Sequence, residues 1–304
     1  MTTPLVRAIK KNMAGSKVFF LTGMASEKVL RHNPYLDGIV IPGPGIVENL
    51  KKYKFDISMD FMNSAVSGYY SLLSGAKKRI AFYRPWGFWC YNVMPKNSGG
   101  GYTVLDRLKM LEALNIKDDG IGLDMKFTAS DEAGVKKFLI ANNISADDFL
   151  VTFDITNRRE HRQWAKEKFG ELADILAGEF RAKIVFLWGP GELEYVKTAV
   201  AGCRYRHILC DNFDILELAA LIKKCKLHVG TSSAPGHIAI SQNTPSFIIY
   251  GMNTDSANWT PPNSTEHGFI QGHLANLSAG EVFLKIREFI KQLGQGGPPR
   301  INII

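Results

Sequence analysis

The chain alternates between short apolar runs and longer segments that are apolar on one face only. Short apolar runs bounded by turn residues are typical of buried strands, and apolar positions three and four apart indicate amphipathic helices. The runs that we interpret as strands are 18–21, 39–41, 55–60, 79–82, 149–153, 183–187, 207–209, 227–229 and 246–250. The helical pattern occurs at 4–14, 26–31, 46–52, 64–74, 104–115, 131–142, 164–180, 192–201, 216–224, 237–242 and 280–293. This alternation predicts an α/β protein with doubly wound parallel sheets.

The length of 304 residues suits two α/β domains of about 150 residues each. A polar segment at 144–148 separates two similar halves, and we take it as the linker. We therefore expect one Rossmann-like domain at 1–145 and a second at 146–304, facing each other across a cleft. Neither half contains a Walker A run, so a P-loop nucleotide site is not expected.

The net charge of +8 favours an anionic partner. The basic residues are spread along the sequence rather than blocked, and no RNA- or DNA-binding signature accompanies them. A phosphorylated or otherwise anionic substrate is therefore the better interpretation, and we expect no nucleic acid partner. A basic nucleic-acid module is the alternative that a binding titration would remove.

The four cysteines show neither a C-x-x-C pair nor a metal-ligand spacing, so we interpret them as reduced thiols and expect no metal. No apolar run approaches the roughly 20 residues of a membrane-spanning helix, and no signal-peptide pattern opens the sequence. We therefore expect a cytoplasmic location. Trp86, Phe88, Trp89 and Tyr91 form an aromatic cluster that either covers the core or makes an acceptor-binding lip or a peripheral membrane contact.

A turn of small residues at 231–236 connects a strand to a short helix. Ser232 or Ser233 is the expected N-cap, and Pro235 suits the first helical turn because its missing N–H costs nothing there. Asn243 is expected to close the helix in a left-handed conformation. Free backbone N–H groups at a helix start bind anions, phosphates above all. An ordinary βαβ connection is the alternative interpretation.

A second candidate anion site is the loop 156–164, which directly follows a strand and contains three arginines. Loops at the carboxyl ends of parallel strands face the ligand in α/β proteins, and arginine forks suit a diphosphate. The alternative is a solvated charged loop.

The sequence "VGTSSAPGHIAISQNTPSFIIYG", followed by "NWTPP", resembles the signature of the bacterial heptosyltransferases, glycosyltransferase family 9. The matching positions are Ser233, Ala234, Pro235, His237, Ala239, Pro245, Gly251, Trp259 and Pro261. The chain departs from the pattern at Ser232, where the family usually has an acidic residue that holds sugar hydroxyls, and at Gly236, where Met is common.

The amino-terminal half resembles the same family in "TTPLVRAIKK", "NPYLDGIVI" and "GAKKRIAFYRP". The family opens with a strand and a Gly-Asp motif that are missing here, so we expect the sequence to be a fragment or to have a misplaced start. The aspartate of that motif is the family's presumed general base, which leaves the catalytic residue unknown. Asp60, at the end of a strand, is a weak candidate near the acceptor, and a turn carboxylate is the alternative.

The resemblance implies a GT-B glycosyltransferase with an acceptor-side domain at 1–145 and a nucleotide-sugar domain at 146–304. It implies inverting, metal-independent transfer, without a cofactor, of heptose from ADP-heptose to the anionic lipopolysaccharide inner core of a Gram-negative bacterium, at the cytoplasmic face of the inner membrane. Arg162 would bind the donor phosphates, Glu192 (with Glu194 as the fallback) the ribose. The full set of implied donor-binding residues is Thr156, Asn157, Arg162, Glu192, Ser232, Ser233, Ala234, Pro235 and His237.

Two rival functions stay open on the same architecture. One is a catalytically impaired family member that only binds nucleotide-sugar or partners, which Ser232 and the absent aspartate favour. The other is a GT-B nucleotide-sugar epimerase, which product analysis with an ADP-sugar would distinguish from a transferase.

Overall fold

The computed structural model describes residues 1–97 and 99–295. The chain divides into two compact units, Met1–Asp124 and Met125–Ile304. The sequence places the domain boundary after residue 145 instead, and helix α6 (Ala129–Ala141) accounts for the difference. This helix packs against α9 (Ile215–Lys224) of the second unit, and the ring of Phe138 lies 5.4 Å from the ring of Phe213, which precedes α9.

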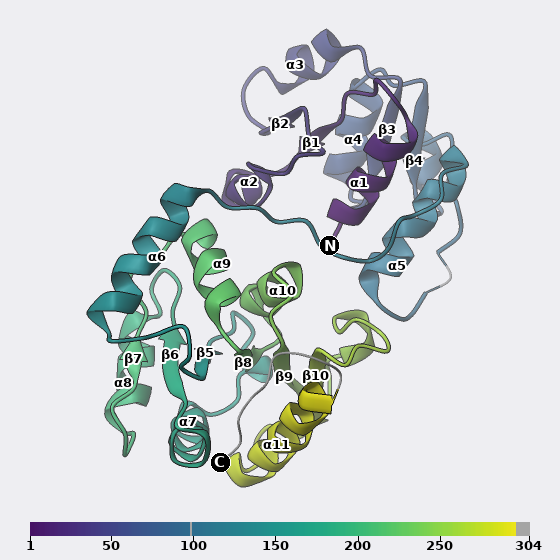
Figure 1. Ribbon diagram of the computed structural model, residues 1–304. Coiled ribbons are helices and arrows are strands. Elements are labelled where there is room, and N and C mark those ends of the chain that lie inside the picture. Colours follow the sequence, from purple (N-terminus) through teal and green to yellow (C-terminus); the bar gives the residue numbers. More distant parts are fainter. Residues whose placement is uncertain (98, 296–304) are drawn as a thin grey trace. The chain divides into compact units, whose positions relative to one another are not determined.

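The first unit is built from short parallel strands and helices (Figure 1). Its elements are α1 (Thr3–Asn12), β1 (Phe19–Leu21), α2 (Met24–Leu30), β2 (Gly38–Val40), α3 (Ile46–Tyr53), β3 (Ile57–Asp60), α4 (Ala65–Leu73), β4 (Lys78–Ala81), η1 (Gly87–Trp89), α5 (Thr103–Leu108) and η2 (Lys109–Leu114). Strand β1 pairs in parallel with β2, and β3 with β4. The core around β4 contains Leu5, Ile80, Tyr102 and Met110, which join α1 to α5 and η2.

The second unit contains one fully parallel six-stranded sheet in the order β10-β9-β8-β5-β6-β7. Its strands are β5 (Leu150–Asp154), β6 (Lys183–Leu187), β7 (Ile208–Leu209), β8 (Leu227–Thr231), β9 (Ser246–Gly251) and β10 (His267–Gly272). If the six strands are numbered 1 to 6 along the chain, from β5 to β10, their order across the sheet, starting at β7, is 3-2-1-4-5-6. It is the strand order of a doubly wound Rossmann sheet, so the expected doubly wound fold is confirmed for this unit.

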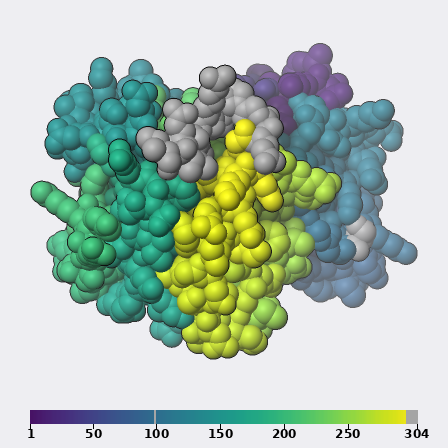
Figure 2. Space-filling model, turned by 60° about the horizontal axis from the view of Figure 1, so that its bottom comes forward, coloured from purple at the N-terminus to yellow at the C-terminus, as the bar shows by residue number. Residues whose placement is uncertain are grey.

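Helices cover both faces of this sheet. They are α7 (Lys166–Phe180), α8 (Leu193–Ala201), α10 (Ala234–Ser241) and α11 (Ala279–Gln295), together with α6 and α9, and the single turns η3 (Glu160–Arg162) and η4 (Ser256–Asn258) complete the unit. The helices α7 and α11 lie side by side, as the teal and yellow side chains of Figure 2 show. Because both faces are covered, β5, β8 and β9 are buried at every position.

The sequence analysis misses one strand of this sheet. Strand β10 is missing from the predicted elements because His267–Gly272 combines two glycines with polar residues and lies at the sheet edge, half exposed. Within the described residues, no helix combines the length and the apolar character needed to cross a membrane.

Candidate functional site

The strand order of the second unit reverses between β5 and β8, which are neighbours in the sheet. At their carboxyl ends Asp154 of β5 lies opposite Gly230 of β8. Ligands of open α/β sheets bind outside the carboxyl ends of the strands at such a switch point. The loop after β5 and the turn after β8, the two anion-site candidates of the sequence, both begin there.

Hydrogen bonds tie that loop to that turn. The Asn157 side-chain amide donates to the Ser232 backbone carbonyl at 2.8 Å and to the Thr231 hydroxyl at 3.4 Å. The Thr231 hydroxyl in turn donates to the Thr156 backbone carbonyl at 2.9 Å. Segments more than 70 positions apart in sequence therefore form one continuous rim at the switch point.

The turn after β8 has the predicted helix signals, but the helix begins earlier than expected. Helix α10 starts at Ala234, with Ser233 as N-cap and Pro235 in its first turn, and Asn243 follows with a left-handed φ of 54°. Within the described residues the Ser233 hydroxyl makes no bond to its own helix and donates instead to the Asp154 carboxylate. The serine therefore joins the helix start to β5.

Asp154 is a site residue that the sequence reasoning missed. Its side chain is buried at the end of β5 and accepts from the hydroxyls of Ser233 and Thr156, the latter at 3.4 Å. Burial raises its pKa to about 7, and the nearby negative charge of Glu192 adds to the increase, while the Ser233 hydrogen bond opposes it. The signal in the sequence is its position directly after the largely apolar run 149–153, because α/β proteins place functional side chains at the carboxyl ends of their strands.

Glu192 points toward the same rim. Its carboxylate accepts from the Thr156 hydroxyl at 2.8 Å and from the Gly189 backbone N–H at 2.7 Å. Glu194, the fallback choice, is exposed and pairs with Lys197 at 2.7 Å. Of the two acids, Glu192 is therefore the one connected to the loop after β5.

Arg162 ends η3, which packs beside the end of β9. A side chain at Gly251 would come within 3.3 Å of the His161 carbonyl, so the two backbones approach closely there. Among the described residues, the buried Nε of Arg162 has no hydrogen-bond partner. Burial lowers the pKa of its guanidinium, and the neighbouring Arg159 acts in the same direction. A guanidinium nitrogen without a partner, close to a second arginine, can donate a hydrogen bond to a bound anion.

A small hollow lies between α10 and the face of β9 that Ser246, Ile248 and Tyr250 share. Its polar lining includes Ser232, Ser233, His237 and Tyr250. The imidazole of His237 packs on the indole of Trp259, with ring centroids 5.7 Å apart. Burial raises the pKa of Tyr250 to about 12. The hollow thus collects the predicted His237 and the unpredicted Tyr250 beside the same turn.

Asp60 belongs to the first unit and is buried at the end of β3. Its carboxylate accepts from the backbone N–H groups of Met62 at 2.8 Å and Asn63 at 3.0 Å, and from the Tyr91 hydroxyl. These contacts are those of a turn carboxylate that holds the chain after β3.

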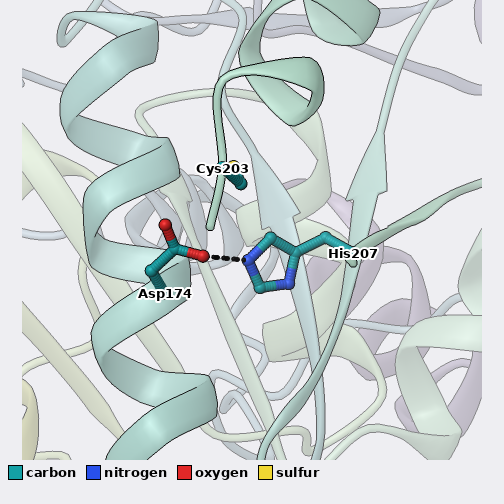
Figure 3. A group of neighbouring side chains, drawn as sticks. All are labelled: Asp174, Cys203 and His207. Atoms are coloured by element: carbon teal, nitrogen blue, oxygen red, sulfur yellow. Dashed lines mark hydrogen bonds and ion pairs between the residues drawn. The ribbon is translucent and has the colours of Figure 1, made fainter. Parts of the chain in front are cut away.

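One group of side chains in the described part of the chain has metal-ligand chemistry: Asp174, Cys203 and His207, whose ligand atoms lie within 4.8 Å of one another (Figure 3). Asp174 accepts from the His207 ring at 3.0 Å and from the backbone N–H groups of Arg204 and Tyr205 at 2.7 and 2.9 Å. Burial raises the pKa of the Cys203 thiol to about 11, which disfavours the metal-binding thiolate. The group therefore fastens the connection between α8 and β7.

The profile of glycosyltransferase family 9 (heptosyltransferase) matches residues 45–284. The chain therefore belongs to this family and is a glycosyltransferase, as the resemblance implied. It is 25% identical to lipopolysaccharide heptosyltransferase 3 of Escherichia coli strain K12 over 282 residues, 86% of this chain and 81% of the relative. It is 30% identical to the lipopolysaccharide core heptosyltransferase OpsX of Haemophilus influenzae over 95 residues, which cover 30% of this chain and 27% of that protein.

Solved structures agree with this fold. A family 9 glycosyltransferase from Veillonella parvula superimposes with a TM-score of 0.86 at 19% identity, covering 96% of this chain and 93% of the other. The E. coli ADP-heptose heptosyltransferase II gives a TM-score of 0.79 at 16% identity, with 96% and 95% covered. The E. coli heptosyltransferase WaaC gives 0.76 at 15% identity, with 97% and 94% covered. These likenesses confirm the α/β, GT-B fold class.

Proposed function

We propose that this glycosyltransferase transfers heptose from ADP-heptose to the lipopolysaccharide inner core by a single inverting, metal-independent displacement. Membership in the heptosyltransferase family supports the reaction class. A similar curated protein is a lipopolysaccharide heptosyltransferase, and the structurally similar WaaC was solved with ADP and with ADP-2-deoxy-2-fluoro heptose. The net charge of +8 fits an anionic donor and an anionic acceptor.

The observation that carries the proposal is the joined rim at the switch point, where Asn157 bonds to the turn at Ser232. In this proposal the backbone N–H groups of Ala234 and Gly236, at the start of α10, face the donor diphosphate. The positive end of the α10 helix dipole adds to this attraction. Proline has no N–H, so the donors are those of the adjacent residues. Arg162 supplies positive charge from the loop side, and His237 lies at the same helix.

Glu192 is proposed to accept hydrogen bonds from the donor ribose. The Thr156 hydroxyl and the Gly189 N–H hold its carboxylate in one orientation, which reduces the conformational freedom that binding would otherwise have to remove. Thr156 and Asn157 then act indirectly. Thr156 orients the carboxylate of Glu192, and Asn157 holds the turn at Ser232.

Stabilisation of the leaving diphosphate is assigned to Arg162 and the α10 amides. Preorganised donors aimed at the position where negative charge develops are worth several kcal/mol in a shielded site, about 3–4 kcal/mol for one donor. The general base is not assigned, because the carboxylate of Asp60, the candidate named from the sequence, accepts three hydrogen bonds in the turn after β3.

The proposal is tested by thermal shift with ADP, UDP and GDP, followed by product analysis with ADP-heptose and a lipopolysaccharide-core acceptor. We expect ADP to stabilise the protein more than UDP or GDP, and heptose to appear on the acceptor. Arg162→Ala should weaken the ADP shift, whereas the exposed Arg158→Ala in the same loop is the matched control. A preference for UDP would refute the heptose assignment.

The same assay separates the rival functions. Epimerised donor in the absence of acceptor would identify an epimerase. Binding of ADP-heptose without turnover under any acceptor condition would identify a family member that only binds the nucleotide-sugar. Equal losses of ADP binding in Arg162→Ala and Arg158→Ala would contradict the specific role of Arg162.

A further inference from the structure

The first unit displays exposed aromatic side chains around η1. Trp86, Phe88 and Trp89 are 38%, 62% and 73% exposed, whereas Tyr91 of the same cluster is 2% exposed and packs in the core. Only Tyr91 therefore covers the core. The exposed rings and the cations next to them form what we call the aromatic–basic patch: Tyr83, Arg84, Trp86, Phe88, Trp89 and Lys96.

Contacts between neighbouring segments bring the patch together. The rings of Phe88 and Trp89 lie 5.0 Å apart, and the Arg84 guanidinium lies 6.0 Å from the Trp86 ring. The backbone N–H of Tyr83 donates to the Pro95 carbonyl at 2.9 Å. That bond places Lys96, the next residue along the chain, beside the start of the aromatic loop.

The loop below the exposed rings is fixed to the core. The Tyr91 hydroxyl donates to Asp60, and the Arg79 guanidinium donates to the Cys90 carbonyl at 2.7 Å. Helix α4 approaches the loop so closely at Gly68 that an added Cβ would lie 3.0 Å from both the Cys90 sulfur and the Tyr91 hydroxyl oxygen. A loop held in this way presents Phe88 and Trp89 to solvent in a defined arrangement rather than by fraying.

The sequence segment that contains the patch carries positive charges only. The stretch 61–105 contains the five cations Lys77, Lys78, Arg79, Arg84 and Lys96 and no aspartate or glutamate. Lys78 and Arg79 bond to backbone carbonyls of the unit itself. Lys96 is exposed and has no hydrogen-bond or ion-pair partner among the described residues. The patch therefore offers uncompensated positive charge beside exposed aromatic rings.

We propose that the aromatic–basic patch docks on the surface of an anionic lipid bilayer. Large apolar side chains that are exposed next to one another mark interaction sites. Tryptophan and tyrosine favour the headgroup level of a bilayer, and cations next to them gain from anionic lipids. Both requirements are met by neighbouring side chains of one rigid loop. The patch belongs to the first unit and the proposed donor site to the second, so this inference does not depend on the donor.

The test is sedimentation of the whole protein with vesicles of phosphatidylcholine alone and with vesicles of equal parts phosphatidylcholine and phosphatidylglycerol. We expect binding to the anionic vesicles that falls with salt. The double variant Phe88→Ser/Trp89→Ser should bind about tenfold or more weakly, and Lys96→Ser about fivefold more weakly at low salt. Ile140→Ser, an equally exposed apolar residue of α6 (65% exposed), is the matched control and should bind like the wild type.

Four outcomes overturn the proposal. They are no binding to anionic vesicles, equal binding to both vesicle types, unchanged binding of the double variant, and an equal loss in Ile140→Ser. If the double variant binds vesicles like the wild type but loses transfer to an acceptor in detergent, the patch is an acceptor surface instead. Because vesicle binding is measured without nucleotide, failure here is distinguishable from failure of the donor assignment.

Discussion

The buried carboxyl of Asp154 should make the free energy of unfolding fall as the pH rises toward neutrality. Replacing Asp154 with asparagine should abolish this pH dependence. The carboxyl is buried at the end of β5, and burial raises its pKa from 3.8 to about 7. Between these two values the folded chain keeps the proton and the unfolded chain releases it. Folding then takes up a proton, so the free energy of unfolding falls as the pH rises through this interval and levels off above about 7.

The size of the effect follows from the pKa difference. Each pH unit between the two pKa values changes the free energy of unfolding by about 1.4 kcal/mol. From about pH 5 to the folded pKa near 7 there are about two such units, so wild type should lose about 3 kcal/mol from this group. Asparagine does not titrate, and its side-chain oxygen still accepts the Ser233 hydroxyl.

The assay is urea unfolding of wild type and Asp154→Asn at about pH 5 and about pH 8. The stability of the variant relative to wild type should rise by about 3 kcal/mol between the two pH values. Buried histidines such as His228 and His267, whose pKa values burial lowers, act in the opposite direction in both proteins and cancel in the difference. Parallel curves for the two proteins would refute the raised pKa of Asp154.

Two further predictions concern β8, the strand that pairs with the end of β5. Gly230→Ala should destabilise the fold by about 1–3 kcal/mol, because the new Cβ would lie 3.0 Å from the Cβ and carbonyl oxygen of Asp154. Gly280→Ala, which meets no atom within 4 Å, is the control, and equal thermal denaturation of the two variants would contradict the steric reason. The imidazole of His228 should stay neutral in NMR titrations between about pH 5 and pH 8, because burial lowers its pKa to about 3. A titration midpoint inside that range would contradict its burial against Thr152.

The apolar pattern and length of the runs in the sequence are enough to predict the central strands of the second unit. The runs at 149–153 and 183–187 are apolar except for Thr152 and Lys183, and β5 and β6 occupy almost the same residues, since central parallel strands are buried on both faces. The edge strand β10 has no such pattern and was missed. Helix α6 was predicted, but amphipathicity does not state which unit a helix packs against, and its contact with α9 needs the tertiary fold.

The site shows the same division between local and long-range information. The turn signals at Pro235 and Asn243 are local and were readable, as was the concentration of arginines near Arg162. The bond between Ser233 and Asp154 joins residues 79 positions apart, so no local pattern could assign the Ser233 hydroxyl to β5 rather than to its own helix.

That long-range bond also explains why a small residue sits in the middle of the site. A side chain at Gly230 would contact Asp154 at 3.0 Å and the His228 ring at 3.2 Å, so the glycine makes room for the buried carboxyl beside β8. Asp154 can then hold Ser233 and, through Thr156, lie within reach of Glu192. The positions of the α10 start and of Glu192 are therefore coupled through one buried acid. A substitution at Asp154 should alter the positions of both.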